Sequence, residues 1–245
     1  MDNAAPREVP AKLFKLAGWR PKLPLSTIVL EDSRLLEYRH PAEIRMLVLA
    51  MAAIAALIAL AVWFRDNNAL LAFAVVYMSM LITSTQSVTY NRLQGAEVTP
   101  TQFPTIYQMV EELRQRFNAP PTHVFVQRKL SFKPEAMGLM APYVIVLPSI
   151  LIDAIEPEEL RYVLGQALGH ICFGHTRTTL LVGGEESALP AVLSWIATLR
   201  DVIFAGYWRA GMMSADRAGI LACGSISKAI RAQVKISVAP IKSPT

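Results

Sequence analysis

Residues 157–175 read PEELRYVLGQALGHICFGH, and this stretch carries most of the information on the fold. Pro157 suits the first position of an α-helix. Glu158 and Glu159 then lie in the first turn, where carboxylates interact favourably with the helix dipole. We therefore predict a helix that begins at Pro157 and ends near Thr176.

The middle of this helix has the spacing of a metal-binding motif but lacks most of its functional groups. In the pattern His-Glu-x-x-His, two imidazoles four residues apart hold a zinc ion, and the Glu deprotonates the metal-bound water. Here Gln166 stands at the first His position, Ala167 at the Glu position and His170 at the second His position. Glutamine is a poor zinc ligand and alanine cannot accept a proton. The sequence predicts a helix of this type without its catalytic chemistry.

A different metal site on the same helix is an alternative. His170 and His175 are five residues apart, and therefore about 140° apart around a helix, so we expect their side chains to diverge. Cys172 and His175 are three residues apart and could share a face. We predict structural roles for all three, because a buried cysteine usually packs as a small apolar side chain.

Composition indicates a membrane protein. Hydrophobic residues make up 53% of the chain and charged residues 18%, with a mean hydropathy of +0.35. This balance is unusually apolar for a soluble protein. The two cysteines, Cys172 and Cys223, provide no disulfide framework. The net charge of +5 comes from scattered residues, so we predict no nucleic-acid partner.

Two apolar stretches predict a membrane hairpin over residues 44–88. Residues 46–64, MLVLAMAAIAALIALAVWF, contain no polar side chain and would span roughly 28 Å as a helix. A buried core helix is the alternative, but such helices are seldom apolar on every face. Residues 69–88 are the weaker candidate and could instead be re-entrant or packed against other helices. The loop between them, residues 65–68, is short enough to force an antiparallel pair.

The distribution of basic residues predicts the orientation of this hairpin. The segment before it, residues 1–43, lacks the features of a signal peptide and is polar. Arg65 is the only basic residue of the connecting loop, whereas the preceding flank carries eight: Arg7, Lys12, Lys15, Arg20, Lys22, Arg34, Arg39 and Arg45. The positive-inside rule then predicts an integral membrane protein with both flanks in the cytoplasm. The membrane is the inner or plasma membrane if the source is bacterial.

The region after the hairpin, residues 89–238, has the pattern of a globular domain, and residues 239–245 form a tail. Amphipathic spacing predicts a helix over residues 102–117. We also predict strands at residues 123–126 and 143–147, a short helix at 148–155, and helix over residues 190–235 with a break near 206–211 or 224. The predicted fold class is therefore α+β: a membrane helical hairpin followed by a mostly helical domain with a small β-sheet.

Three segments together carry a resemblance to a known family. Residues 121–151 (PTHVFVQRKLSFKPEAMGLMAPYVIVLPSIL), residues 157–175 and residues 214–224 (SADRAGILACG) resemble the HtpX-like, CAAX-prenyl-protease-related membrane zinc metallopeptidases, peptidase family forty-eight. The resemblance covers about residues 44–238. It implies a zincin-like domain of the kind in which three protein ligands hold zinc.

The resemblance assigns further residues to the degenerate site. Met212 stands where the family has a Glu ligand, and Asp216 matches the acidic residue that supports the first His ligand. Two of the three ligands and the base are therefore missing, and we predict that no zinc is bound. We expect the Gln166 amide to donate a hydrogen bond to Asp216. We also expect Met212 to fill the vacated ligand space near His170 and to make the former site apolar.

The predicted function is that of a membrane-anchored pseudopeptidase, a binding, scaffold or regulatory subunit that contacts the lipid bilayer and another membrane or membrane-associated protein. In zincins a substrate strand lies along an edge strand above the motif helix. By resemblance, that edge is formed by Tyr143, Val144, Ile145, Val146 and Leu147. Two alternatives remain open: an active membrane zinc metalloendopeptidase with an atypical ligand set, and a purely structural membrane subunit.

Overall fold

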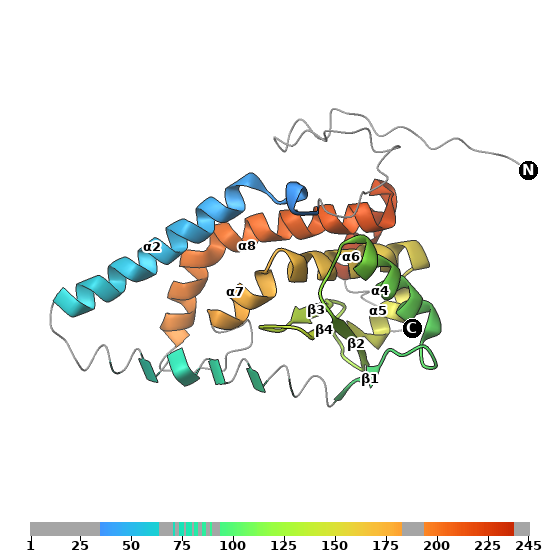
Figure 1. The fold of residues 1–245 in the computed structure, drawn as a ribbon, viewed down its shortest axis with the longest axis horizontal. Helices are drawn as coiled ribbons and strands as arrows, with labels where there is room; N and C mark the ends of the chain where they lie inside the picture. The colour runs from blue at the N-terminus through green and yellow to red at the C-terminus, as the bar shows by residue number, and fades with distance from the viewer. Residues whose placement is uncertain are drawn as a thin grey trace, which may run out of the picture.

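The computed structural model describes residues 35–63, 94–182 and 194–237, with scattered positions between 71 and 89. In these ranges the elements are η2 (Leu35–Tyr38), α2 (Pro41–Trp63), β1 (Ala96–Glu97), α4 (Pro104–Arg116), β2 (Thr122–Gln127), β3 (Glu135–Met137), β4 (Tyr143–Pro148), α5 (Ser149–Ala154), α6 (Pro157–Cys172), α7 (His175–Leu181), α8 (Ser194–Cys223) and α9 (Ile226–Ser237). Figure 1 shows α2 extending away from the domain that contains the sheet. The predicted α+β class is confirmed.

The first predicted membrane span forms a helix. In the described part of the chain, residues Pro41–Leu60 of α2 are long and apolar enough to cross a membrane, with a mean hydropathy of 2.2. Only 11% of its most apolar window is buried, which argues against the core-helix alternative. Half of the second predicted span, residues 69–88, lies outside the described residues.

The sheet is small and mixed, and its order is β1-β2-β4-β3. β4 pairs in parallel with β2, where Val124 opposes Ile145, and antiparallel with β3, where Ala136 opposes Ile145. All six residues of β4 are buried. β4 is an inner strand, so the prediction that residues 143–147 form the edge strand is wrong; the edges of the described sheet are β1 and β3. Three residues, EAM, are too short to show an alternating pattern, so β3 is not recognisable from the sequence.

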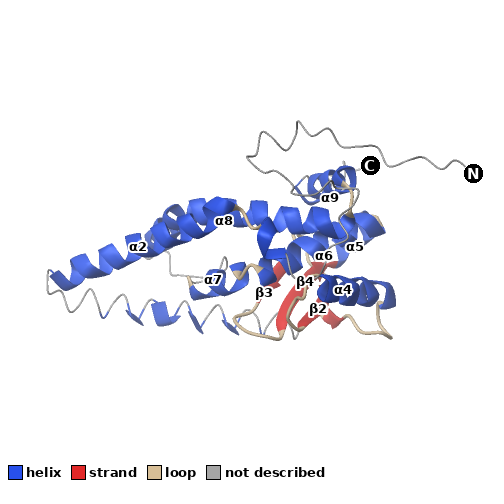
Figure 2. Ribbon diagram, turned by 45° about the horizontal axis from the view of Figure 1, so that its top comes forward, coloured by secondary structure: helices blue, strands red, loops and turns tan. Residues whose placement is uncertain are grey.

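Helix α6 lies at the centre of the domain. Figure 2 shows the sheet on one side of α6 and helices α8 and α9 on the other. Its apolar residues Leu164 and Leu168 are completely buried and belong to one core with Ile145 and Leu147 of β4. A helix buried on several faces in this way holds its polar side chains in fixed positions.

Glycines bring α6 and α8 unusually close together. A Cβ atom on Gly165 would lie 2.2 Å from the Cβ of Ala222, and one on Gly169 would lie 2.6 Å from the Cβ of Ala218. Both distances are shorter than carbon atoms tolerate, so only glycine permits this contact. The close approach places polar residues of α6 within hydrogen-bond reach of α8.

The end of the motif helix differs from the prediction. The motif helix ends at Cys172, not near Thr176, because Gly174 adopts a left-handed conformation with φ of 80°. A second helix, α7, begins directly afterwards at His175. Between α8 and α9 the break lies at Gly224, with φ of 67°, and not at residues 206–211.

Candidate functional site

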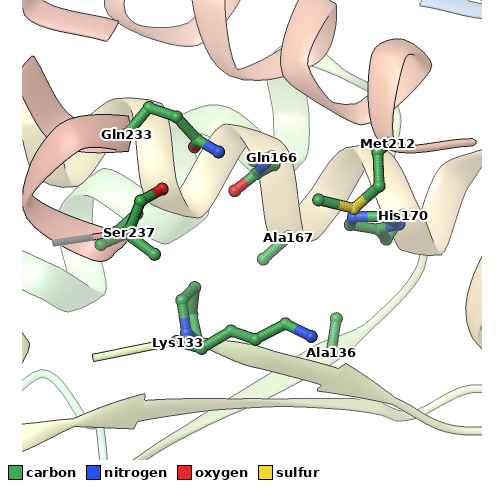
Figure 3. A pocket seen from close by; sticks show the side chains of 10 residues that line it. Lys133, Ala136, Gln166, Ala167, His170, Met212, Gln233 and Ser237 are labelled. Atoms are coloured by element: carbon green, nitrogen blue, oxygen red, sulfur yellow. The ribbon is translucent and has the colours of Figure 1, made fainter. Parts of the chain in front are cut away.

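A pocket of about 260 Å³ lies where the sequence places the degenerate motif. Figure 3 shows residues of the motif helix α6 facing the β3 segment across this pocket. The ten lining residues are Lys133, Pro134, Ala136, Gln166, Ala167, His170, Met212, Gln233, Ile236 and Ser237. The predicted site residues Gln166, Ala167, His170 and Met212 therefore meet in one place, although Met212 comes from a different helix.

Gln166 is held by a short hydrogen bond. Its Nε2 donates to Oδ1 of Asp216 at 2.6 Å, which confirms the predicted pair. Tyr162 donates its hydroxyl to the same oxygen at 3.1 Å. Burial raises the pKa of Asp216, and the two hydrogen bonds oppose that rise because they favour the carboxylate. Arg217, the next residue along α8, donates to the backbone oxygen of Tyr38 at 3.1 Å.

Met212 stands beside His170. Figure 3 shows its thioether next to the imidazole ring of His170, as predicted for a residue that replaces a ligand. The expectation that the former site is apolar is only partly right. Gln233 and Ser237 also line the pocket at its other end, and the Lys133 side chain runs along its floor with the ammonium toward Ala136.

The two histidines of the motif contact each other. Nδ1 of His170 lies 2.9 Å from Nδ1 of His175, so the prediction that their side chains diverge is wrong. Helical geometry does not apply across this pair, because α6 ends at Cys172 and the left-handed Gly174 separates it from α7, which begins at His175. Nε2 of His175 in turn lies 2.9 Å from Oε1 of Glu43.

These contacts fix one proton of the histidine pair. The Glu43 carboxylate can only accept, so Nε2 of His175 carries a proton. One hydrogen bond joins the two Nδ1 atoms, and its direction depends on the charge of His175. Burial lowers the pKa of His170 to about 3, and the charges of His175 and Lys133 act in the same direction. His170 is therefore neutral at physiological pH.

Glu43 is the site residue that sequence reasoning missed. It belongs to the first turn of α2, and its side chain is completely buried. In addition to His175, it accepts hydrogen bonds from Arg39 at 2.6 Å and from Ser214 at 2.5 Å. From the sequence, an acidic residue in the first turn of an apolar helix is explained by its favourable interaction with the helix dipole. Nothing local to residue 43 indicates a partner on α7 or α8.

The remaining histidines and cysteines have structural environments. His123 lies 2.6 Å from Glu97 in an exposed pair on neighbouring strands, and Nδ1 of His40 accepts from the backbone of Ala42 at 3.2 Å. Burial raises the pKa of Cys172 to about 12 and raises that of Cys223 as well, so neither thiol is activated.

The donor groups present do not fit a zinc ion. Tetrahedral protein sites use imidazole, thiolate or carboxylate donors. At the position expected for the first ligand the NH₂ group of Gln166 points at Asp216, and at the position expected for the third Met212 offers only a thioether. In the part of the chain that the structure describes, no group of three or more His, Cys, Asp or Glu is arranged to hold a metal. Among the three expected ligand positions, only His170 has a typical zinc-binding side chain.

The motif helix packs between a small mixed sheet and two further helices, and a helix apolar enough to cross a membrane precedes this domain. A family model described as Peptidase family M48 matches residues 100–243, more than half of the chain. The chain therefore belongs to peptidase family M48. No curated protein and no solved structure matches it.

Proposed function

We propose that this chain is a membrane-anchored pseudopeptidase of family M48 that acts as a binding, scaffold or regulatory subunit of a membrane-associated complex. The observation that carries the proposal is the hydrogen bond from Gln166 to Asp216 at 2.6 Å. In the family the residue matching Asp216 supports the first His ligand. In this chain it holds an amide that cannot replace that ligand.

The losses act together on catalysis. Removal of a general base commonly costs about 10²- to 10⁴-fold in rate, and Ala167 occupies the position of that base. Gln166 and Met212 remove two of the three metal ligands, so the Lewis acid is lost as well. Restoring any one of these groups would leave the others missing. An active peptidase with an atypical ligand set is therefore the weaker alternative.

Retention of the pocket supports binding without cleavage. β3 is an edge strand that pairs on one side with β4, and Ala136 at its centre lines the pocket opposite α6. An extended segment of another protein can add to such an edge through backbone hydrogen bonds, which are independent of any metal. A purely structural subunit would not require this space.

The test of the proposed function is the zinc content and peptidase activity of the purified full-length protein. We expect far less than one zinc per chain by elemental analysis and no cleavage of an unfolded protein substrate. A variant His170→Ala is the matched control, because it removes the last zinc-binding group. About one zinc per wild-type chain, lost in this variant, would overturn the proposal and favour the atypical peptidase.

We further propose that the globular domain and residues 1–43 share the cytoplasmic side of the membrane. The backbone nitrogen of His40, just before α2, contacts Oγ of Ser214 at 2.8 Å, and Tyr38 accepts a hydrogen bond from Arg217. If α2 crosses the bilayer, the chain must return before residue 94 to allow these contacts. Residues 69–88 are the apolar stretch available for that return.

Cysteine labelling of sealed vesicles tests this topology. Lys12→Cys, in the N-terminal segment, and Leu130→Cys, at a side chain that is 97% exposed, should react with a membrane-impermeant reagent from the same side. Asn67→Cys, in the short connecting loop, should react from the opposite side. Cys172 and Cys223 are first replaced by alanine. Reaction at positions 12 and 130 from opposite sides would contradict the hairpin.

A further inference from the structure

The N-terminal half of α8 packs against the apolar part of α2. A Cβ atom on Gly206 would lie 2.9 Å from Sδ of Met46, so the two helices touch there. Further along α2, Ala50 forms one buried cluster with Phe204 and Tyr207 of α8. The two helices also lie side by side in both views of the fold (Figures 1 and 2). Whatever surrounds this part of α2 therefore also surrounds α8.

The apolar run of α2 has no length to spare for contacts outside a membrane. Residues 46–64 span roughly 28 Å as a helix, and the hydrocarbon core of a bilayer is about 30 Å thick. If α2 crosses, Ala50 lies about 6 Å and Ile54 about 12 Å beyond the start of this run. Both residues contact the cluster that contains Phe204 and Ile203. These residues of α8 then lie at a similar depth in the bilayer.

α8 also has the residue types that mark a membrane surface, at the level where α2 has them. Arg45 directly precedes the apolar run of α2. On α8, Trp208 and the exposed Arg209 lie about one turn nearer the domain than Gly206, which contacts Met46. Tryptophan and basic side chains concentrate where a helix leaves the hydrocarbon. The two helices therefore indicate the same boundary.

The outward face of this part of α8 suits contact with lipid. Val202 is 70% exposed and Leu199 is 42% exposed, although both are large and apolar. Arg200 and Asp201 are the only charged residues of the sequence between positions 194 and 208, and they pair at 2.8 Å. Ionisable residues at membrane depth commonly pair with one another in this way. The segment therefore has no net charge to carry into the bilayer.

We propose that residues 194–208 of α8 form a re-entrant membrane element, which lies in the cytoplasmic half of the bilayer beside α2 and contacts lipid through Val202. This inference rests on the proposed function, since it requires α2 to be a membrane anchor. The element does not cross, because two crossings need about 40 helical residues and α7 begins only at His175. Met212 follows Arg209 by about one turn, so the candidate site lies close to the membrane surface.

The experiment places a nitroxide spin label at single cysteines of the full-length protein in lipid nanodiscs, after Cys172 and Cys223 are replaced by alanine. Collision rates are measured with oxygen, which concentrates among acyl chains, and with a water-soluble nickel chelate. At Val202→Cys we expect oxygen collisions to be frequent and nickel collisions to be rare.

Two matched positions calibrate this measurement. Leu57→Cys reports the lipid environment, because Leu57 is a 48% exposed residue of α2. Ile230→Cys reports water, because Ile230 is a 58% exposed apolar residue of α9, on the globular domain. The ratio of oxygen to nickel collision rates at position 202 should match that at position 57 and exceed that at position 230 several-fold. All three side chains are exposed, so circular dichroism should show an unchanged fold.

The outcomes separate this inference from the proposed function. A lipid-like ratio at position 57 with a water-like ratio at position 202 overturns the re-entrant element and leaves the anchor intact. Protection of position 202 from both reagents also overturns it, because protein would then cover Val202. Lipid-like ratios at all three positions would mean that the whole domain contacts the bilayer, which contradicts a localised element. A water-like ratio at position 57 would overturn the membrane anchor and the inference together.

Discussion

Replacement of Glu43 by alanine is expected to lower the free energy of unfolding by about 3 kcal/mol, because removing one member of a buried charged network leaves its partners uncompensated. Glu43 is completely buried and connects α2 to α7 through His175 and to α8 through Ser214. A loss of this size corresponds to a decrease of roughly 6 to 12 °C in Tm for a chain of this length. Circular dichroism during heating in nanodiscs measures it.

The control is the same substitution at a surface ion pair. Glu111 and Arg114 on α4 are both about one-third exposed, and exposed pairs contribute about 0 to 1 kcal/mol. Glu111→Ala should therefore change Tm by less than a third of the effect at position 43. Equal, small effects of the two substitutions would mean that the buried network contributes little to docking of α2 against the domain.

Zinc binding should appear only when all the missing groups are restored together, which a double and a triple variant distinguish. The double variant Gln166→His, Ala167→Glu is expected to bind no stoichiometric zinc, because Met212, which lines the pocket, stands where the resemblance places the third ligand. Addition of Met212→Glu should give about one zinc per chain. The prerequisites are already present, since Asp216 can accept a hydrogen bond from a histidine at position 166 and His170 is a neutral imidazole.

Zinc should also stabilise the triple variant. At a free zinc concentration 100 times the Kd, binding contributes about 2.7 kcal/mol, so Tm rises on addition of zinc and falls on addition of chelator. The control replaces Met213, the neighbouring residue outside the pocket, by Glu in the double variant. Zinc binding or proteolysis by the double variant, or by this control, would show that Met212 does not correspond to the third ligand.

The sequence by itself predicted most of the helices and the residues that meet in the candidate site. Pro157 and the acidic first turn predicted the start of α6, and a capping box between Glu156 and Glu159 adds to that signal. The uninterrupted apolar stretch of α2 needed no tertiary information. The pair formed by Gln166 and Asp216 was also predictable, because the family pattern names both positions and an amide retains a hydrogen-bond donor.

Only the tertiary structure decided which groups surround that site. β3 is a strand because the edge of β4 must pair its backbone groups, not because EAM prefers an extended conformation. His170 meets His175 because Gly174 permits a left-handed turn that a helical projection ignores. Glu43 belongs to the same cluster although it precedes His175 by 132 residues in the sequence. Sequence patterns report local periodicity and motif chemistry, whereas contacts between distant segments depend on how complete elements pack against one another.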